Sequence, residues 1–127
     1  MLYTVTNGVY TAQVDSLGAQ LVSLRGPEGF EYIWTGDPAY WTGHAPVLFP
    51  IVGALREGRA LLDGQWVEMG RHGFARRQEF QAAEQGEGTL SLTLAANPET
   101  KACYPFDFAL TVTYRLNPQG YTTVFAV

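Results

Sequence analysis

Residues 106–116 read Phe-Asp-Phe-Ala-Leu-Thr-Val-Thr-Tyr-Arg-Leu, and this stretch decides the fold class. Every second residue from Phe106 to Leu116 is apolar, and the residues between them are mostly polar. Successive side chains of an extended chain point to opposite faces, so the apolar set lies on one side. A helix would scatter the same residues around its circumference. The pattern therefore predicts a β-strand that buries one face.

Further strands are expected on both sides of this stretch. Asp63-Gly64 tolerates the positive φ angles of a tight turn and separates residues 59–62 from 65–69, which predicts a hairpin. Gln85-Gly86-Glu87-Gly88 connects residues 79–83 to the alternating Leu90, Leu92 and Leu94, which predicts a second one. Other strands are predicted at residues 3–6, 9–14, 19–25 and 121–127. No helix longer than one turn is predicted.

These connections are short, which favours antiparallel pairing because parallel strands need longer crossovers. The 127 residues fit one domain, and 46% hydrophobic against 16% charged residues supplies enough apolar material for a core. The fourteen glycines and seven prolines are spread along the chain and suit many short extended segments. We therefore predict an all-β antiparallel fold over residues 1–127, for which a sandwich and a barrel both fit.

Charge and cysteine content exclude several classes of function. The formal net charge of −4 leaves no broad positive surface for a polynucleotide, so no nucleic-acid partner is expected. Cys103 is the one cysteine, and neither a signal peptide nor an apolar run of about 20 residues is present. These features predict a cytoplasmic protein without a membrane partner. Two histidines far apart predict no metal site and no cofactor.

Residues 36–58 interrupt the alternation with an irregular, apolar segment, and segments of this kind are usually functional or anchored against the core. It contains His44, for which a structural or solvent-facing role is predicted. Trp34, Trp41 and Trp66 have two interpretations. They either pack in the core, as most such aromatic residues do, or stack on sugar rings.

His72 is the stronger of the two candidate histidines. It lies in Gly70-Arg71-His72-Gly73-Phe74-Ala75-Arg76-Arg77, where the nearby positive charge favours a neutral ring that donates and accepts hydrogen bonds. Such a ring suits a sugar hydroxyl, and the alternative is a turn histidine at a hairpin end. No pair of carboxylates has a spacing that indicates an acid and base, and no nucleophile or phosphate-loop motif is present.

Several motifs occur in an order that resembles the aldose 1-epimerase (galactose mutarotase-like) family. The branch that they resemble most is the LacX-like and glucose-6-phosphate 1-epimerase-like one. The motifs, in chain order, are Asp15-Ser16-Leu17-Gly18-Ala19-Gln20-Leu21, Trp34-Thr35-Gly36-Asp37-Pro38-Ala39-Tyr40-Trp41, Ala45-Pro46-Val47-Leu48-Phe49-Pro50-Ile51-Val52-Gly53, Asp63-Gly64, His72-Gly73-Phe74-Ala75-Arg76 and Tyr104-Pro105-Phe106-Asp107-Phe108. The resemblance implies a β-sandwich of the galactose mutarotase-like type. It covers the whole chain but roughly the first two-fifths of a full-length member.

The resemblance also implies a reaction, the interconversion of the α and β anomers of a hexose or hexose phosphate. In the family a glutamate base and a histidine acid open and reclose the sugar ring, and both are expected beyond Val127. This chain therefore has no predicted catalytic residue and is expected to be inactive alone. The resemblance makes His72 and Arg76 substrate-binding residues, with Arg71 and Arg77 as weaker candidates.

One departure concerns the residue after Gly53, which is arginine in many relatives and Ala54 here. Either Arg56 replaces that arginine, which adds it to the predicted substrate-binding residues, or the contact is missing. Two functions from other classes stay open: a non-catalytic carbohydrate-binding β-sandwich module and a structural sandwich. The second is motivated by the apolar end of the chain, Phe125-Ala126-Val127, which predicts an exposed strand and association between copies.

Overall fold

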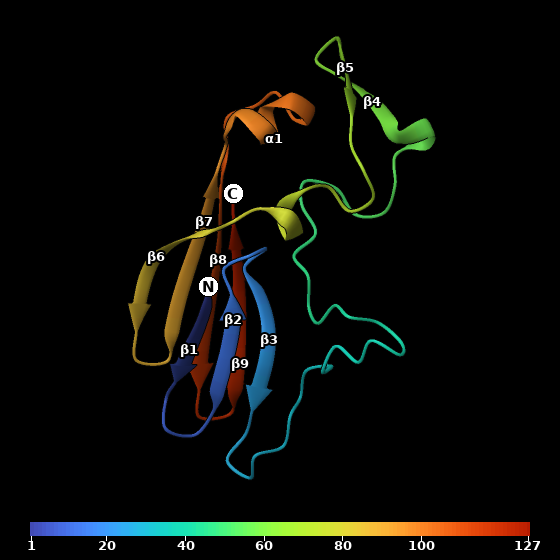
Figure 1. Ribbon diagram of the computed structural model, residues 1–127. Helices are drawn as coiled ribbons and strands as arrows, with labels where there is room; N and C mark the ends of the chain where they lie inside the picture. Colours follow the sequence, from blue (N-terminus) through green and yellow to red (C-terminus); the bar gives the residue numbers. More distant parts are fainter.

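Two antiparallel β-sheets lie face to face in the computed structural model, which describes residues 1–127 (Figure 1). The first sheet pairs, in order, β1 (Leu2–Thr6), β2 (Thr11–Asp15) and β3 (Gln20–Arg25). The second pairs, in order, β6 (Gln81–Gly86), β7 (Thr89–Ala95), β8 (Ala109–Asn117) and β9 (Gly120–Ala126). A separate hairpin, β4 (Arg59–Leu62) and β5 (Gln65–Glu68), projects from one end (Figure 1). The predicted antiparallel β-sandwich is confirmed.

The core fills the space between the two sheets. Val14 and Leu21 from the first sheet and Leu92 and Val112 from the second belong to one cluster of buried side chains. Burial of each such aliphatic side chain stabilises the fold by roughly 1.5–3 kcal/mol. The sheets are also joined by a hydrogen bond, because the buried Tyr114 hydroxyl on β8 donates to the Ala19 carbonyl at 2.8 Å. Desolvation raises the pKa of Tyr114 to about 12.

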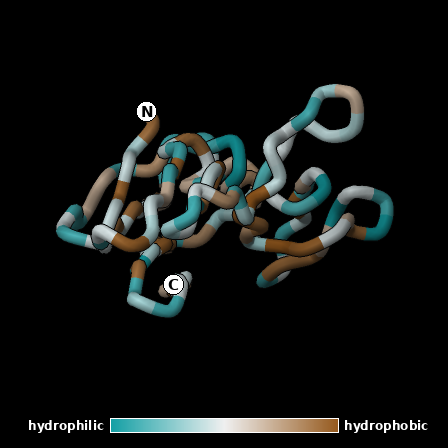
Figure 2. The backbone as a smooth tube through the Cα atoms, turned by 90° about the horizontal axis from the view of Figure 1, so that it is seen from below, coloured by the Kyte–Doolittle hydropathy of each residue, from teal (hydrophilic) through white to brown (hydrophobic).

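The predicted hairpins are confirmed, and their turns have the expected chemistry. Asp63 and Gly64 adopt φ angles of 47° and 76°, both in the left-handed region that a two-residue turn of this kind requires. β6 and β7 form the second hairpin, and β8 and β9 a third. Hydrophilic and hydrophobic stretches follow one another along most of the chain (Figure 2), and residues 45–55 of the irregular segment are the long apolar run.

The predicted strand at 106–116 begins three residues later, at Ala109. Phe106 and Phe108 pack instead against Tyr104, at ring distances of 5.0 and 5.9 Å. Leu110, Val112 and Tyr114 are buried as the alternation predicts. Aromatic packing therefore draws the first residues of the pattern out of the strand.

The prediction of no helix longer than one turn is wrong, because α1 spans Pro98–Cys103. Its six residues exceed the 3.6 of one turn. The Asn97 side chain accepts from the Thr100 backbone N–H at 3.0 Å, and the Thr100 hydroxyl accepts from the Asn97 backbone N–H at 2.9 Å. This capping box, together with Pro98 at the first helical position, starts the helix at a place without apolar periodicity. No helix in the structure has the length and apolar character needed to cross a membrane.

The predicted irregular segment, 36–58, contains no strand and ends in a short 3-10 helix, η1 (Arg56–Gly58). It is anchored to the sandwich at several points. Ala45 forms an isolated bridge with Leu21, and the His44 backbone N–H donates to the Gln20 side chain at 3.0 Å. The His44 ring Nδ1 also lies 2.7 Å from the Trp34 carbonyl, so His44 holds the segment together.

The core interpretation of the three tryptophans is wrong. Trp34, Trp41 and Trp66 are 43%, 51% and 64% exposed. Trp34 and Trp41 lie in the chain between β3 and β4, outside the two sheets, and Trp66 lies on the outer face of β5, opposite the buried Val67. None of the three can reach the core from these positions.

β9 forms the edge of the four-stranded sheet and pairs with β8 alone. Its apolar side chains are largely outside the core, and Phe125 is 58% exposed. An exposed apolar edge of this kind favours pairing with another chain. Association of two copies through β9 stays a prediction.

Candidate functional site

The FPIVG and HGFAR motifs cross at Phe49 and Gly73, which form a parallel bridge. The Phe49 carbonyl accepts hydrogen bonds from the backbone N–H groups of Phe74 at 2.9 Å and Ala75 at 3.2 Å. Gly73 has a φ angle of 71°, and a Cβ atom there would lie 2.2 Å from the Phe49 carbonyl oxygen. Only glycine allows both this backbone conformation and this approach. The crossing therefore depends on the glycine of the His-Gly pair.

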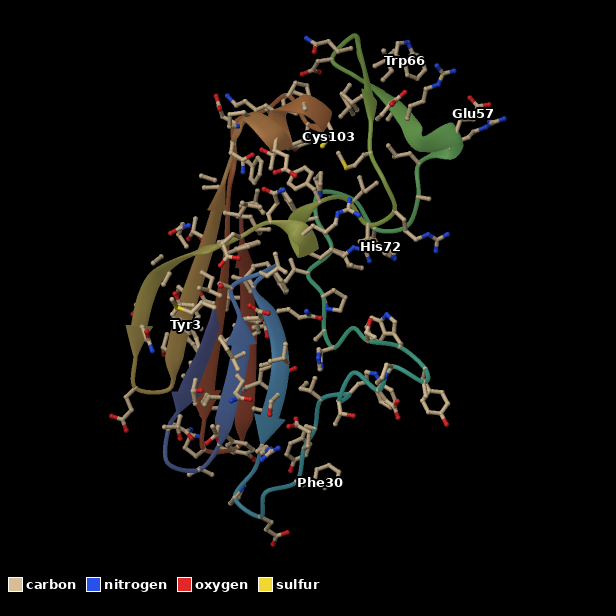
Figure 3. The ribbon with its side chains drawn as sticks, in the orientation of Figure 1. Tyr3, Phe30, Glu57, Trp66, His72 and Cys103 are labelled. Carbon is tan, nitrogen blue, oxygen red and sulfur yellow. The ribbon has the colours of Figure 1, made fainter.

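His72 is fixed by the other end of the FPIVG motif. Its backbone N–H donates to the Gly53 carbonyl at 2.7 Å, and the Gly53 backbone N–H donates to the His72 ring Nδ1 at 2.8 Å. His72 has a φ angle of 66°, so its backbone is held in the left-handed region. Figure 3 shows its side chain between the sandwich and the β4–β5 hairpin, in the irregular part of the structure.

The bond from Gly53 decides which ring nitrogen of His72 carries the proton. Because Nδ1 accepts the backbone N–H, it has no proton of its own, and a neutral ring carries its proton on Nε2. His72 is half-buried, and Nε2 makes no hydrogen bond within this chain. The arrangement leaves one directed N–H donor for a ligand oxygen.

Arg76 follows His72 in the short 3-10 helix η2 (Ala75–Arg77). Its guanidinium donates to the Arg71 carbonyl at 3.2 Å, and the Arg77 guanidinium donates to the Gly73 carbonyl at 3.3 Å. The Arg76 backbone is packed against Gly18, where a Cβ atom would lie 2.8 Å from the Arg76 carbonyl oxygen. The turn between β2 and β3, which contains Gly18, therefore packs against the segment that carries Arg76. None of these three arginines forms an ion pair.

Aromatic side chains pack beneath the crossing. The ring of Phe49 lies 6.0 Å from Phe74, 6.3 Å from Tyr104 and 5.2 Å from Phe108, in edge or tilted arrangements. Such pairs stabilise by roughly 0.5–1.5 kcal/mol each beyond their buried area. The YPFDF motif thus supports the segment that holds His72, although it is about thirty residues further along the chain. Four of the motifs therefore meet around the crossing: those that contain Gly18, Phe49, His72 and Tyr104.

Arg56 is separated from that arrangement. It lies in η1 and is exposed, and its side chain makes no hydrogen bond or ion pair with His72 or Arg76. Figure 3 labels its neighbour Glu57 on the hairpin side of the irregular region, apart from His72. Ala54 is also exposed. Leu55 between them is partly buried and packs against the core cluster, while residues 54 and 56 both face solvent.

The site contains no acid–base pair. Neither His72 nor Arg76 contacts a carboxylate, and the acidic residue nearest to Arg56 in sequence, Glu57, pairs with Arg59 at 3.6 Å. Burial raises the pKa of the half-buried Cys103 thiol, so this side chain is not an activated nucleophile. No three His, Cys, Asp or Glu side chains are grouped around a point that a metal ion would occupy.

The cavities of the chain lie elsewhere. One of about 210 Å³ separates the β4–β5 hairpin from Pro50 and Tyr104, and its lining is almost wholly apolar. Two others, of about 290 and 260 Å³, follow the opening between β3 and β9. Neither His72 nor Arg76 lines any of them. The candidate site is therefore an open surface. It is identified by the chemistry of its residues and not by a cavity.

The family model described as aldose 1-epimerase matches residues 1–127. The chain belongs to the aldose 1-epimerase family. Two forms of protein LacX from Lactococcus lactis subsp. lactis, plasmid and chromosomal, are each 38% identical to it. Each alignment covers all of this chain and 44% of the LacX protein. This aldose 1-epimerase chain thus spans less than half the length of those relatives.

Solved structures agree with the family and with the fold. A galactose mutarotase-like protein from Lactobacillus casei has a TM-score of 0.94 at 33% identity, and covers 98% of this chain and 43% of its own. A galactose mutarotase related enzyme from Lactobacillus acidophilus has a TM-score of 0.89 at 32% identity, with the same shares of the two chains. The predicted galactose mutarotase-like sandwich is confirmed.

Sequence reasoning missed the residues that position His72. Gly53 orients the imidazole through its backbone N–H, and Gly73 allows the crossing that brings Gly53 within reach. A signal was present, because Gly53 ends the FPIVG motif and Gly73 directly follows His72 within HGFAR, and glycine is frequent where the chain must turn. The pairing itself joins residues 19 apart across an irregular segment, where no periodicity indicates a partner.

Proposed function

We propose that this aldose 1-epimerase family chain supplies sugar-binding contacts for the interconversion of the α and β anomers of a hexose or hexose phosphate. The observation that carries the proposal is the pairing of Gly53 with His72. It leaves the Nε2–H group of His72 as an oriented donor beside a segment with three arginines and no carboxylate. Hydroxyl and phosphate oxygens are the acceptors that such a set of donors suits.

Arg76 is proposed as the second sugar contact. Its guanidinium has one hydrogen bond, to the Arg71 carbonyl, and a guanidinium has five N–H donors. The remaining donors are available for a pair of sugar hydroxyls or for two oxygens of a phosphate. Because no acidic side chain pairs with it, a ligand does not have to displace an existing ion pair.

Arg56 is proposed as the replacement for the arginine that many relatives have at position 54. Ala54 and Arg56 are both exposed, on either side of the partly buried Leu55, and the Arg56 side chain has no partner in this chain. A long side chain two positions further on then lies close to the place where Ala54 leaves room. This contact needs Arg56 to extend back toward His72.

The chain alone is proposed to bind without catalysing the reaction. Anomer interconversion requires one group to remove the proton of the anomeric hydroxyl and another to protonate the ring oxygen. His72 has no carboxylate partner with which to share that work. The same observation supports the second candidate function, a non-catalytic carbohydrate-binding module, in which the contacts of His72 and Arg76 are the whole activity.

Binding and catalysis are tested separately in the 127-residue chain. Glucose, galactose and glucose 6-phosphate are titrated against the protein, and chemical shifts of the His72 region are followed by NMR. His72→Asn is the informative variant, since asparagine tolerates a positive φ angle and removes the imidazole. We expect a ligand-dependent shift in the wild type that is lost in His72→Asn. Absence of any shift with all three sugars contradicts the proposal.

A matched pair of variants tests the arginine contact. Arg76→Ala is expected to weaken binding, and Arg115→Ala, which removes an exposed arginine from β8, is expected to leave it unchanged. Anomer exchange is then measured by polarimetry and two-dimensional exchange NMR. We expect no acceleration over the buffer rate by the chain alone. A clear acceleration shows that the acid and the base are both within residues 1–127.

A further inference from the structure

Exposed aromatic side chains gather on the segment that follows β3. Trp34 and Trp41 are about half exposed, and Tyr40 is 82% exposed. The rings of Trp34 and Tyr40 lie 6.2 Å apart and nearly perpendicular, at 76°. A contiguous exposed apolar patch marks an interaction site more often than single exposed side chains do. We call Trp34, Tyr40 and Trp41 the aromatic loop.

The aromatic loop is held in place by its own hydrogen bonds. The Trp34 indole N–H donates to the Trp41 carbonyl at 2.7 Å, which ties the two ends of the loop together. The backbone N–H groups of Tyr40 and Trp41 both donate to the Asp37 carbonyl, and the Asp37 side chain accepts from the Ala39 N–H at 2.9 Å. The backbone of the loop and the Trp34 ring are therefore ordered before any ligand arrives, which lowers the entropy cost of binding.

The start of the segment is equally fixed. The Glu31 carboxylate accepts hydrogen bonds from the Leu24 backbone N–H at 2.8 Å, from the Ile33 backbone N–H at 3.0 Å and from the Ser23 hydroxyl. At the other end, Gly43 packs against the Trp41 ring, where a Cβ atom would lie 2.3 Å from Cζ2. One face of the Trp41 indole is thus backed by the chain.

The aromatic loop offers no basic side chain to an anionic ligand. Asp37 is the one charged residue between Ile33 and Leu55, and its carboxylate is engaged in the turn. The Trp34 indole N–H is satisfied within the loop, so the ring faces are what it offers to a partner. An uncharged ligand with an apolar face and polar edges matches such a surface. A pyranose ring has that character, because its C–H groups gather on one face.

We propose that the aromatic loop is a second carbohydrate-binding site, which takes a neutral pyranose ring by stacking on Trp41 and on the Trp34–Tyr40 pair. It is separate from the contacts of His72 and Arg76 and uses no hydrogen-bond donor of theirs. The site goes beyond the proposed function, because a stacked ring needs no free anomeric hydroxyl. In Figure 1 the loop lies outside the two sheets, on the side of the molecule that also carries the β4–β5 hairpin.

The indole N–H signals give a direct test, because the chain has three tryptophans. The ¹⁵N-labelled chain is titrated with methyl β-D-glucopyranoside and methyl β-D-galactopyranoside. The anomeric oxygen of each is blocked by the methyl group, so neither sugar interconverts its anomers. We expect the Trp34 and Trp41 signals to shift in a saturable way and the Trp66 signal to stay in place. No shift of the loop tryptophans, or an equal shift of Trp66, overturns the proposal.

Two variants assign the effect to the loop. Tyr40→Ala removes a ring that is 82% exposed, so the packing of the chain is kept, and Trp41→Ala removes the central ring. Loss of one aromatic partner is expected to weaken glycoside binding about 3- to 10-fold. Trp66→Ala is the matched control and is expected to leave binding unchanged. Unchanged binding in both loop variants contradicts the proposal.

The outcome is distinguishable from that of the proposed function. His72→Asn is expected to lose the hexose-dependent shifts near residue 72 while the methyl glycosides still shift Trp34 and Trp41. Loss of both responses in His72→Asn shows a single site and overturns the second one. The other possible partner of the aromatic loop is a second copy of the chain. Light scattering of the wild type and of Trp41→Ala tests this by measuring the oligomeric state. A dimer that Trp41→Ala dissociates, with no glycoside response, refutes the proposal.

Discussion

Replacement of Gly73 by alanine tests the crossing that positions the candidate site. Alanine with a φ angle of 71° costs about 1–2 kcal/mol from backbone strain alone. The new Cβ atom would lie 2.2 Å from the Phe49 carbonyl oxygen, so the crossing must open. Opening the crossing breaks or weakens the two hydrogen bonds to that oxygen, each of which contributes about 0.5–1.5 kcal/mol. We expect a total loss of about 2–5 kcal/mol in the free energy of unfolding.

Urea denaturation followed by tryptophan fluorescence measures this loss. With a slope of about 2 kcal/mol per molar urea, the midpoint is expected to fall by about 1–2.5 M. Gly8→Ala is the matched control, because Gly8 has a φ angle of 82° and nothing within 4 Å of the position that a Cβ would take. It carries the backbone strain without the clash, and we expect a loss of about 1–2 kcal/mol. Equal losses in the two variants refute the close approach of Gly73 to Phe49.

Three further predictions concern groups that join parts of the fold. The Tyr114 pKa of about 12 lies above its ordinary value of 10.0, so the stability that the neutral hydroxyl contributes is complete below pH 10 and is lost as the pH rises toward 12. Measurement of the unfolding free energy against alkaline pH is expected to show this loss in the wild type and not in Tyr114→Phe. Burial raises the pKa of Glu31, but hydrogen bonds from Ser23, Leu24 and Ile33 lower it overall. The stability that the Glu31 carboxylate contributes is therefore present above the ordinary pKa of 4.5 and is lost as the pH falls. Glu31→Gln is expected to reduce the loss of stability at acid pH, and an unchanged acid dependence contradicts this stabilising role of Glu31. Asn97→Ala removes the helix cap and a 3.1 Å bond to the Gln78 side chain, and is expected to cost about 1–2 kcal/mol in calorimetry, whereas the exposed Glu99→Ala is expected to cost much less.

The antiparallel strands were predictable because their signals are local, whereas the choice of a sandwich over a barrel came from the family resemblance. One-sided burial imposes a period of two on β7 and β8, and Asp63-Gly64 encodes its turn directly. α1 escaped prediction because a six-residue helix has too few turns to show a period. Its start signal was nevertheless present in Asn97-Pro98-Glu99-Thr100, where the side chains of Asn97 and Thr100 form the cap.

The candidate site was predictable in its members but not in its geometry. The resemblance singled out His72 and Arg76, and the structure places them on one segment beside the FPIVG motif. The bond from Gly53 to the imidazole depends on the crossing at Phe49 and Gly73, a tertiary contact without a sequence period. The exposure of the tryptophans had the same cause, since in an irregular segment no alternation tells which side faces solvent.

The most direct test of the central claim is an NMR measurement of the His72 imidazole nitrogens during a sugar titration. Long-range ¹H–¹⁵N correlations are expected to show a neutral ring with its proton on Nε2, since Nδ1 accepts from Gly53 at 2.8 Å. Addition of glucose or galactose is expected to shift the Nε2 signal, while the His44 signals stay in place. A proton on Nδ1, or an Nε2 signal unmoved by every sugar, contradicts the account.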